Sequence, residues 1–173
     1  ACDGAHRHAP FPALSVRMRL LYWTAFWVFL LDQVTKYLVV HAMELRVLGR
    51  IDVLPPYLNL RMAWNYGINF GLMAGDSPVT RWVLIAVALV ISGAVLWWVH
   101  HEPAGRWQKI AAGLLVGGAL GNVIDRLIYG AVADFLNMSC CGINNPYAFN
   151  VADIAVFVGA FGLVLVPAGK KPS

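Results

Sequence analysis

Apolar positions along the 173-residue chain fall into four long runs separated by shorter polar stretches. The runs cover residues 20–40, 82–99, 110–124 and 149–166. At 1.5 Å per residue, a helix of about 20 residues crosses roughly 30 Å of hydrocarbon. The pattern therefore predicts a mainly α-helical membrane protein with four transmembrane helices and both termini on the same side.

A period-two pattern occupies residues 51–73, between the first two apolar runs. Leu58, Leu60 and Met62 alternate with more polar neighbours, as in a strand with one apolar face. Pro55 and Pro56 disfavour a helix before this strand. Residues 65–71 then combine turn-forming residues with a second short strand. We therefore expect a small extracytoplasmic β-sheet between the first and second helices.

Composition supports the membrane assignment. Hydrophobic residues make up 60% of the chain and charged residues 13%, whereas soluble domains are roughly 45–50% apolar. The net charge of +4 is spread over the flanks of the apolar runs, so a nucleic-acid partner is not expected. We expect one membrane-embedded domain over residues 18–167. Residues 1–17 would be a disordered tail or an extended start, and residues 168–173 a cytoplasmic tail.

The basic residues also suggest an orientation. Arg106 and Lys109 lie between the second and third runs, and Lys170 and Lys171 follow the fourth. Because cytoplasmic loops carry an excess of Lys and Arg, both termini are predicted to be cytoplasmic. Residues 32, 36, 125 and 153 then lie near the outer ends of their helices, within about 12 Å of the surface at 1.5 Å per residue. The ionisable side chains, which are expensive to bury in a membrane, are thus predicted to share one layer near the outer, periplasmic face.

Several of these polar groups have a structural explanation. Asp32 and Lys36 are four residues apart on one helix, so they can form a structural ion pair that lowers the cost of burial. Asp125 and Arg126 are expected to form a second brace. Glycines at positions 113, 117 and 121 recur every four residues, a spacing that allows helix backbones to approach closely.

Asp134 and Asp153 have no basic neighbour in sequence and are the candidate catalytic residues. Two carboxyl groups within hydrogen-bonding reach share a proton, so that one can activate water while the other donates to a scissile carbonyl. Buried acids also occur in proton-coupled transporters, which remain an alternative, and the glycine stripe would also suit a non-catalytic scaffold. The sequence has no His-Glu-x-x-His motif, and we expect neither a metal nor a cofactor.

Five blocks, in this order, resemble those of the bacterial lipoprotein signal peptidase, signal peptidase II. They are Asp32-Gln33-x-Thr35-Lys36, Asn65-x-Gly67-x-x-Phe70-Gly71, Gly121-Asn122-x-x-Asp125-Arg126, Val132-x-Asp134-Phe135 and Phe149-Asn150-x-Ala152-Asp153. The resemblance implies an aspartic endopeptidase of the bacterial inner membrane. It would remove signal peptides from diacylglyceryl-modified prolipoproteins by cutting before the lipidated cysteine.

The resemblance also implies roles for individual residues. Asp134 and Asp153 would be the catalytic pair, and globomycin-type peptides would inhibit the enzyme by occupying its site. The positions that would shape the substrate site are Asn65, Gly67, Asn122, Asp125, Arg126 and Asn150. Asn69 departs from the family, which usually has a small residue there, and the loop 138–146 with Cys140 and Cys141 has no counterpart that we can match.

Overall fold

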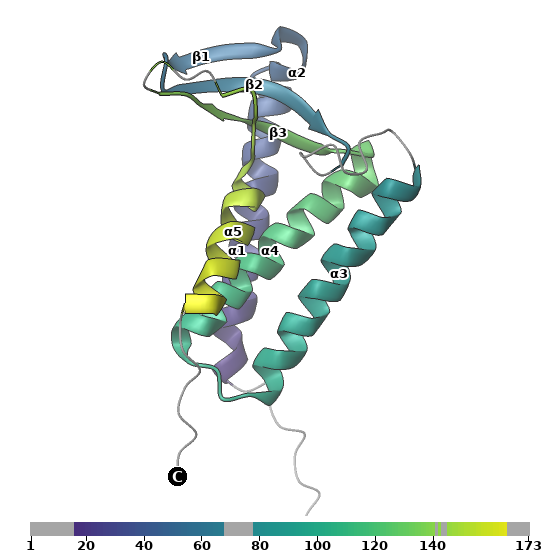
Figure 1. The fold of residues 1–173 in the computed structure, drawn as a ribbon, viewed down its shortest axis with the longest axis vertical. Coiled ribbons are helices and arrows are strands. Elements are labelled where there is room, and N and C mark those ends of the chain that lie inside the picture. The colour runs from purple at the N-terminus through teal and green to yellow at the C-terminus, as the bar shows by residue number, and fades with distance from the viewer. Residues whose placement is uncertain (1–15, 68–77, 141, 143–144, 166–173) are drawn as a thin grey trace, which may run out of the picture.

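The structure is a computed structural model that describes residues 16–67, 78–140, 142 and 145–165. Within these residues, four long helices form a bundle that a three-stranded sheet caps at one end (Figure 1). α1 begins and α5 ends at the opposite end (Figure 1). The expected C-terminal tail, residues 168–173, and most of the expected N-terminal tail lie outside the described residues.

The helices match the four apolar runs, with different ends. They are α1 (Val16–Lys36), α3 (Pro78–His101), α4 (Arg106–Tyr129) and α5 (Val151–Leu165). α1 continues as a π-helix, η1 (Tyr37–Ala42), and a short helix, α2 (Leu45–Leu48), follows. α4 is longer than the predicted 110–124. The prediction followed the apolar run alone, whereas the helix also includes polar residues before and after that run. Gln108 accepts a hydrogen bond from the Gly105 N–H at 2.8 Å, and Gly130 ends the helix at φ 80°.

Two of the described helices, Pro78–His101 and Arg106–Tyr129, are long and apolar enough to cross a membrane. Val151–Leu165 is apolar but shorter. α1 carries polar residues near its end, among them Asp32 and Lys36, which are almost completely buried. The fold is therefore mainly helical, with a membrane-type composition in part of its bundle.

Small residues bring α4 into close contact with both neighbouring helices. A Cβ atom added at Gly117 would lie 2.5 Å from the Ala25 carbonyl oxygen of α1. A Cβ atom at Gly118 would lie 2.5 Å from the Ala152 carbonyl oxygen of α5. Both distances are too short for any real side chain. The predicted close approach of helix backbones is confirmed, and it extends to α5 through Gly118.

The sheet consists of β1 (Arg50–Leu54), β2 (Leu58–Asn65) and β3 (Val132–Met138), all antiparallel and in that order. The prediction of a small sheet is confirmed, but its location entirely between the first two helices is wrong. β3 follows α4 and pairs with β2, with Asp134 opposite Ala63. The short strand that we predicted after Asn65 would lie at residues outside the described part of the chain.

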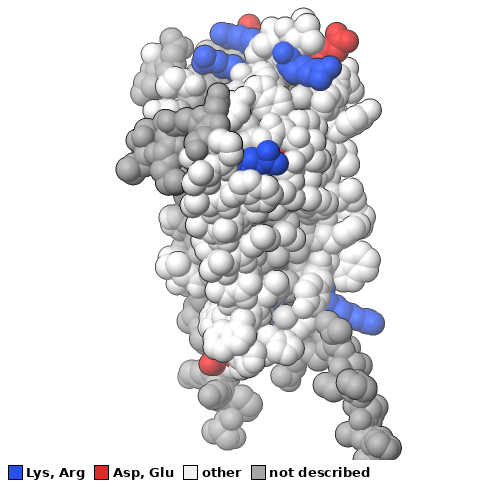
Figure 2. Space-filling model, turned by 90° about the vertical axis from the view of Figure 1, so that its right-hand side faces the viewer, with Lys and Arg blue, Asp and Glu red and all other residues white. Residues whose placement is uncertain are grey.

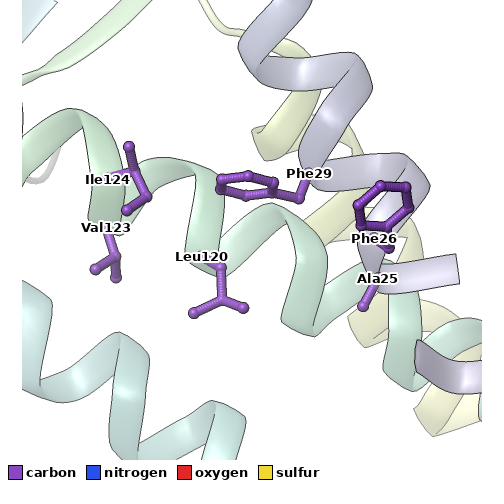
Figure 3. A pocket seen from close by; sticks show the side chains of 6 residues that line it. All are labelled: Ala25, Phe26, Phe29, Leu120, Val123 and Ile124. Atoms are coloured by element: carbon purple, nitrogen blue, oxygen red, sulfur yellow. The ribbon is translucent and has the colours of Figure 1, made fainter. Parts of the chain in front are cut away.

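A wholly apolar cavity of about 330 Å³ opens between α1 and α4 (Figure 3). Its lining comprises Ala25, Phe26, Phe29, Leu120, Val123 and Ile124. It contains none of the polar residues that the sequence singled out. This cavity is therefore separate from the candidate site.

Candidate active site

Asp134 and Asp153 reach the same site from different elements. Asp134 lies on β3, whereas Asp153 lies in the first turn of α5. Asn150 connects them, because its side-chain Nδ2 donates to Asp134 Oδ1 at 2.7 Å and its backbone N–H donates to Asp153 Oδ2 at 3.2 Å. The two candidate catalytic acids are thus joined through one residue, although they are separated by 19 positions in sequence.

Amide groups bind all four oxygens of this pair. Besides the two contacts of Asn150, Asn65 Nδ2 donates to Asp134 Oδ2 at 3.1 Å. Asn122 Nδ2 donates to Asp153 Oδ1 at 2.9 Å. Neither acid forms an ion pair within the described part of the chain. The site therefore orients both carboxyl groups with neutral donors, which leaves their charge uncompensated by direct contact with a cation.

The start of α5 fixes the position of Asp153. Asn150 Oδ1 accepts the Asp153 backbone N–H at 2.9 Å, while Asp153 Oδ2 accepts the Asn150 N–H. These reciprocal bonds form a capping box, in which the cap residue and the third helical residue satisfy each other's backbone. The same two residues thus begin the helix and position a candidate catalytic carboxyl group.

The environment of Asp134 favours its protonated form. Its side chain is buried, with 2% of the residue exposed. Burial raises the pKa of Asp134 to about 7 from its ordinary value of 3.8, and the charge of nearby Asp153 acts in the same direction. Hydrogen bonds from Asn65 and Asn150 oppose part of this rise in pKa. Near neutral pH, one proton is therefore readily available in this site.

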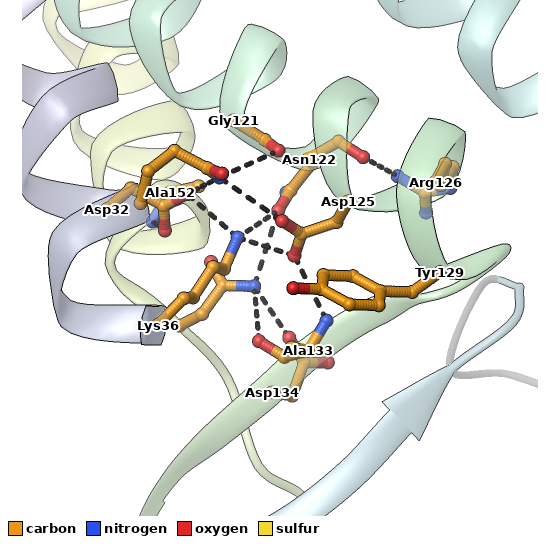
Figure 4. A network of polar contacts seen from close by, with 12 residues as sticks. Asp32, Lys36, Gly121, Asn122, Asp125, Arg126, Tyr129, Ala133, Asp134 and Ala152 are labelled. Atoms are coloured by element: carbon orange, nitrogen blue, oxygen red, sulfur yellow. Dashed lines mark hydrogen bonds and ion pairs between the residues drawn. The ribbon is translucent and has the colours of Figure 1, made fainter. Parts of the chain in front are cut away.

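A second polar network lies beside Asp134 and joins Asp32, Lys36 and Asp125 (Figure 4). Lys36 Nζ lies 2.8 Å from Asp32 Oδ2 and 2.8 Å from Asp125 Oδ2. All three residues are at most 5% exposed. These contacts confirm that the polar groups of α1 and α4 share one layer, at the end of the bundle that carries the sheet.

This network binds the backbone N–H groups of the residues that immediately precede the two acids. Asp32 Oδ1 accepts the Ala152 N–H at 2.9 Å, and Ala152 immediately precedes Asp153. Asp125 Oδ2 accepts the Ala133 N–H at 3.1 Å, and Ala133 immediately precedes Asp134. Lys36 contacts both Asp32 and Asp125, so it links the two carboxylates that bind these backbone N–H groups.

Two amide side chains link the network to the acid pair. Asn122 Oδ1 accepts from Lys36 Nζ at 3.4 Å and from Asn150 Nδ2 at 3.3 Å. Gln33 Nε2 donates to Asp32 at 3.1 Å and to Asp125 at 3.2 Å. Sequence reasoning assigned no role to Gln33. Its position one residue after a buried acid within an apolar run was the available signal.

The remaining predicted site residues lie at the edge of this network. The Gly67 N–H donates to Asn65 Oδ1 at 3.2 Å, which orients the amide that binds Asp134. Arg126 Nη1 donates to the Asn122 carbonyl at 3.3 Å, and its buried Nε has no hydrogen-bond partner among the residues that the structure describes. The expected brace between Asp125 and Arg126 is wrong, because Asp125 forms its ion pair with Lys36.

An aromatic cluster that the sequence did not reveal borders the site. Tyr129 OH and His41 Nε2 are 3.1 Å apart, and the Trp64 ring lies 5.4 Å from the Tyr129 ring. These contacts tie η1 and the end of α4 to β2, next to Asn65. Within the described residues, no three His, Cys, Asp or Glu side chains gather as a metal ion would require.

Comparison with known proteins identifies the family. Residues 24–167 match the family model described as signal peptidase (SPase) II. The chain belongs to the signal peptidase II family. It is 40% identical over 144 residues to the lipoprotein signal peptidase of Alteromonas mediterranea, with 83% of this chain and 77% of that protein covered. It is also 40% identical over 150 residues to that of Rhodopseudomonas palustris, with 82% and 90% covered.

Solved structures share the fold of this chain. Two bacterial membrane enzymes determined by the in meso method, at 2.3 Å and 1.9 Å resolution, share the fold with TM-scores of 0.71 and 0.70. The first is 29% identical and covers 84% of this chain and 85% of its own. The second is 27% identical, with 84% and 90% covered. Membership in the signal peptidase II family makes the chain a peptidase, and its neighbours and apolar helices make it a membrane protein.

Proposed function

We propose that this chain is an aspartic endopeptidase that removes signal peptides from diacylglyceryl-modified prolipoproteins by cutting before the lipidated cysteine. The relatives named lipoprotein signal peptidase support the substrate class. The observation that carries the catalytic assignment is that Asn150 joins Asp134 and Asp153 beside a Lys36 network that holds both backbones.

In the proposed reaction, Asp153 takes a proton from a water molecule while protonated Asp134 donates its proton to the scissile carbonyl oxygen. The water oxygen attacks the carbonyl carbon, and a tetrahedral intermediate forms. Its collapse breaks the C–N bond, the proton held by Asp153 goes to the leaving amine, and one hydroxyl proton of the intermediate returns to Asp134, which restores both acids and gives the carboxylic acid product. Asn65, Asn122 and Asn150 keep both carboxyl groups in place throughout. This division of roles requires carboxyl groups with different proton affinities.

The proposal includes a membrane arrangement. α1, α3, α4 and α5 would each cross the bacterial inner membrane, with both termini in the cytoplasm and the sheet at the periplasmic face. Asp134 and Asp153 lie at the sheet end of the bundle, so the site would adjoin the outer leaflet, in which a diacylglyceryl group is anchored (Figure 1). A globomycin-type peptide would bind at the same acids and inhibit.

Mass spectrometry of the cleavage products tests this function. The purified chain is incubated with a diacylglyceryl-modified precursor peptide and, as a matched control, the same peptide without the lipid. We expect cleavage of the lipidated peptide alone, with the modified cysteine as the new amino terminus. Cleavage elsewhere, equal cleavage of both peptides or no cleavage by folded protein would contradict the proposal.

A further inference from the structure

A polar pocket of about 270 Å³ lies on the sheet, apart from the acids of the candidate active site. All three strands contribute to it, together with the turn between β1 and β2 and the chain that follows β3. Its lining comprises Arg50, Pro55, Pro56, Asn59, Arg61, Asn137, Ser139 and Asn145. None of these residues contacts Asp134 or Asp153 through a hydrogen bond in the described structure. The pocket is therefore a second site with its own chemistry.

The pocket brings two guanidinium groups to one place. Arg50 on β1 is directly opposite Arg61 on β2 in the register of the sheet. Like charges directly opposite each other destabilise an antiparallel pair. Lys and Arg side chains also gather at the sheet end of the molecule in Figure 2. Such a pairing calls for a compensating negative charge.

The described residues supply only part of that charge. Arg50 Nε contacts Asp52 Oδ1 at 2.6 Å, with 61% and 48% of the two side chains exposed. An exposed pair of this kind contributes little to stability. Asp52 is also shared, because Asn59 donates to it at 3.0 Å in the amide orientation that satisfies its neighbours. Arg61 is exposed and forms no ion pair within the described residues, so its guanidinium group is accessible to a ligand.

The other polar groups add to the excess of donors. Asn145 Oδ1 already accepts the Tyr147 N–H at 3.0 Å, and Ser139 Oγ accepts the Asn145 N–H at 3.1 Å. Within the described residues the Ser139 hydroxyl donates no hydrogen bond, so it can donate to a ligand in the same pocket as the two guanidinium groups. A concave site with surplus donors and net positive charge matches an oxyanion.

We propose that Arg50 and Arg61 together bind one phosphate group in this pocket. A phosphate presents at least three acceptor oxygens and so can bridge two guanidinium groups, whereas one guanidinium already satisfies both oxygens of a carboxylate. The phosphate is either that of a lipid headgroup beside the sheet or free phosphate. This assignment does not depend on the proposed peptidase function.

Thermal unfolding of the full chain in an uncharged detergent tests the site. Inorganic phosphate is compared with sodium chloride and with sodium glutamate at equal ionic strength. We expect phosphate alone to raise Tm by roughly 3 °C or more near saturation, because a ligand that binds only the folded state stabilises it. Arg61→Gln should weaken phosphate binding about tenfold or more, the loss that follows from removing a hydrogen bond between charged groups. Arg46→Gln, an exposed arginine of α2 outside the pocket, should keep the full response.

The same measurement in lipid nanodiscs distinguishes the two sources of phosphate. In nanodiscs of phosphatidylglycerol, a site filled by lipid headgroups would no longer respond to added phosphate, whereas it would respond in discs of an uncharged glycolipid. Equal responses in both discs would identify free phosphate as the ligand. An equal shift with glutamate, an undiminished shift in Arg61→Gln, or no shift with phosphate in detergent or glycolipid discs would each overturn the proposal. If Arg61→Gln does not fold, Arg50→Gln replaces it with the same expected loss.

Discussion

Asn150 shows how a single residue connects local folding with chemistry. Its side chain begins α5 by accepting the Asp153 N–H, and the same amide donates to Asp134. A hydrogen bond at a helix cap typically contributes about 1 kcal/mol to stability. Here the cap also sets the position of one carboxyl group relative to the other, so the residue that caps α5 also positions the proposed catalytic pair.

The raised pKa of Asp134 predicts a pH dependence of stability. In the unfolded chain this carboxyl titrates near its ordinary value of 3.8, and in the folded protein near 7. Between these values the folded state holds one more proton than the unfolded state, so the free energy of unfolding falls as pH rises from about 4 to about 7. Above that range the contribution is constant.

Thermal unfolding at a series of pH values between 5 and 8 checks this prediction in wild type and Asp134→Asn. Asparagine stays neutral, so the variant should lose less stability than wild type as pH rises through this range. The other titrating groups are present in both proteins, so the difference between the two profiles reports Asp134 together with its coupling to Asp153. Profiles that run parallel over the whole range would show that Asp134 titrates normally in the folded protein.

At the scale of the elements, the Lys36 network fixes β3 and α5 to the helix bundle. Lys36→Met would leave Asp32 and Asp125 as buried carboxylates without their cation. Removing one partner from a buried ion pair typically costs about 3–5 kcal/mol. We therefore expect a large fall in Tm, together with a loss of peptidase activity in whatever fraction stays folded.

The matched control is Arg46→Met, which removes a cationic side chain from the exposed surface of α2. Exposed substitutions of this kind usually change stability by less than about 0.5 kcal/mol. Both variants are compared with wild type by thermal unfolding in detergent and by turnover per folded molecule. A Lys36→Met protein that is as stable and as active as the Arg46→Met control would contradict the role given to the network.

Close packing between α4 and α5 also supports the candidate active site, because it occurs next to Asp153. Gly118→Ala would place a Cβ atom 2.5 Å from the Ala152 carbonyl oxygen, one residue before Asp153. Because overpacking typically costs about 1–3 kcal/mol, we expect a lower Tm and lower activity. Gly93→Ala in α3 meets nothing within 4 Å and should leave both unchanged or raise Tm slightly. Equal behaviour of the two variants would show that α4 and α5 separate without consequence.

The helices were predictable because their apolar runs are long, but their ends were not. η1 extends the first helix beyond Lys36 as a π-helix, and polar capping around Gly105 lengthens α4 at its start. β3 escaped prediction for a different reason. Its residues are buried almost without interruption, so the alternation that reveals a half-exposed strand such as β2 is absent.

Within the candidate site, the sequence singled out the two candidate acids but did not indicate how they are held. Asp134 and Asp153 stood out as acids in apolar surroundings without a basic neighbour. Lys36 was expected to pair with Asp32 alone, and its contact with Asp125 depends on how α1 and α4 meet in space. Ala133 and Ala152 donate through their backbone N–H groups, which every residue except proline has. The sequence therefore does not indicate these hydrogen bonds, and only the structure reveals them.

At the scale of the whole molecule, the sheet and the ends of the helices enclose the polar groups together. α1, α4 and α5 contribute Asp32, Asn122 and Asp153 from the bundle, whereas β2 and β3 contribute Asn65 and Asp134 from the sheet. The site therefore exists only when the sheet sits on the bundle, as in Figure 1. In the proposed membrane arrangement, this site would meet a peptide bond at the boundary between membrane and water.

The most direct test of the proposed acid pair is the cleavage rate of a diacylglyceryl-modified precursor peptide by Asp134→Asn and Asp153→Asn. Each change keeps the size of the side chain and removes its ability to exchange a proton, and general acid–base catalysis typically contributes about 10²–10⁴-fold. We predict that each variant stays folded in detergent and loses at least about a thousandfold in turnover. A folded variant of either kind that cleaves at a rate near that of wild type would contradict the assignment of Asp134 and Asp153 as the catalytic pair.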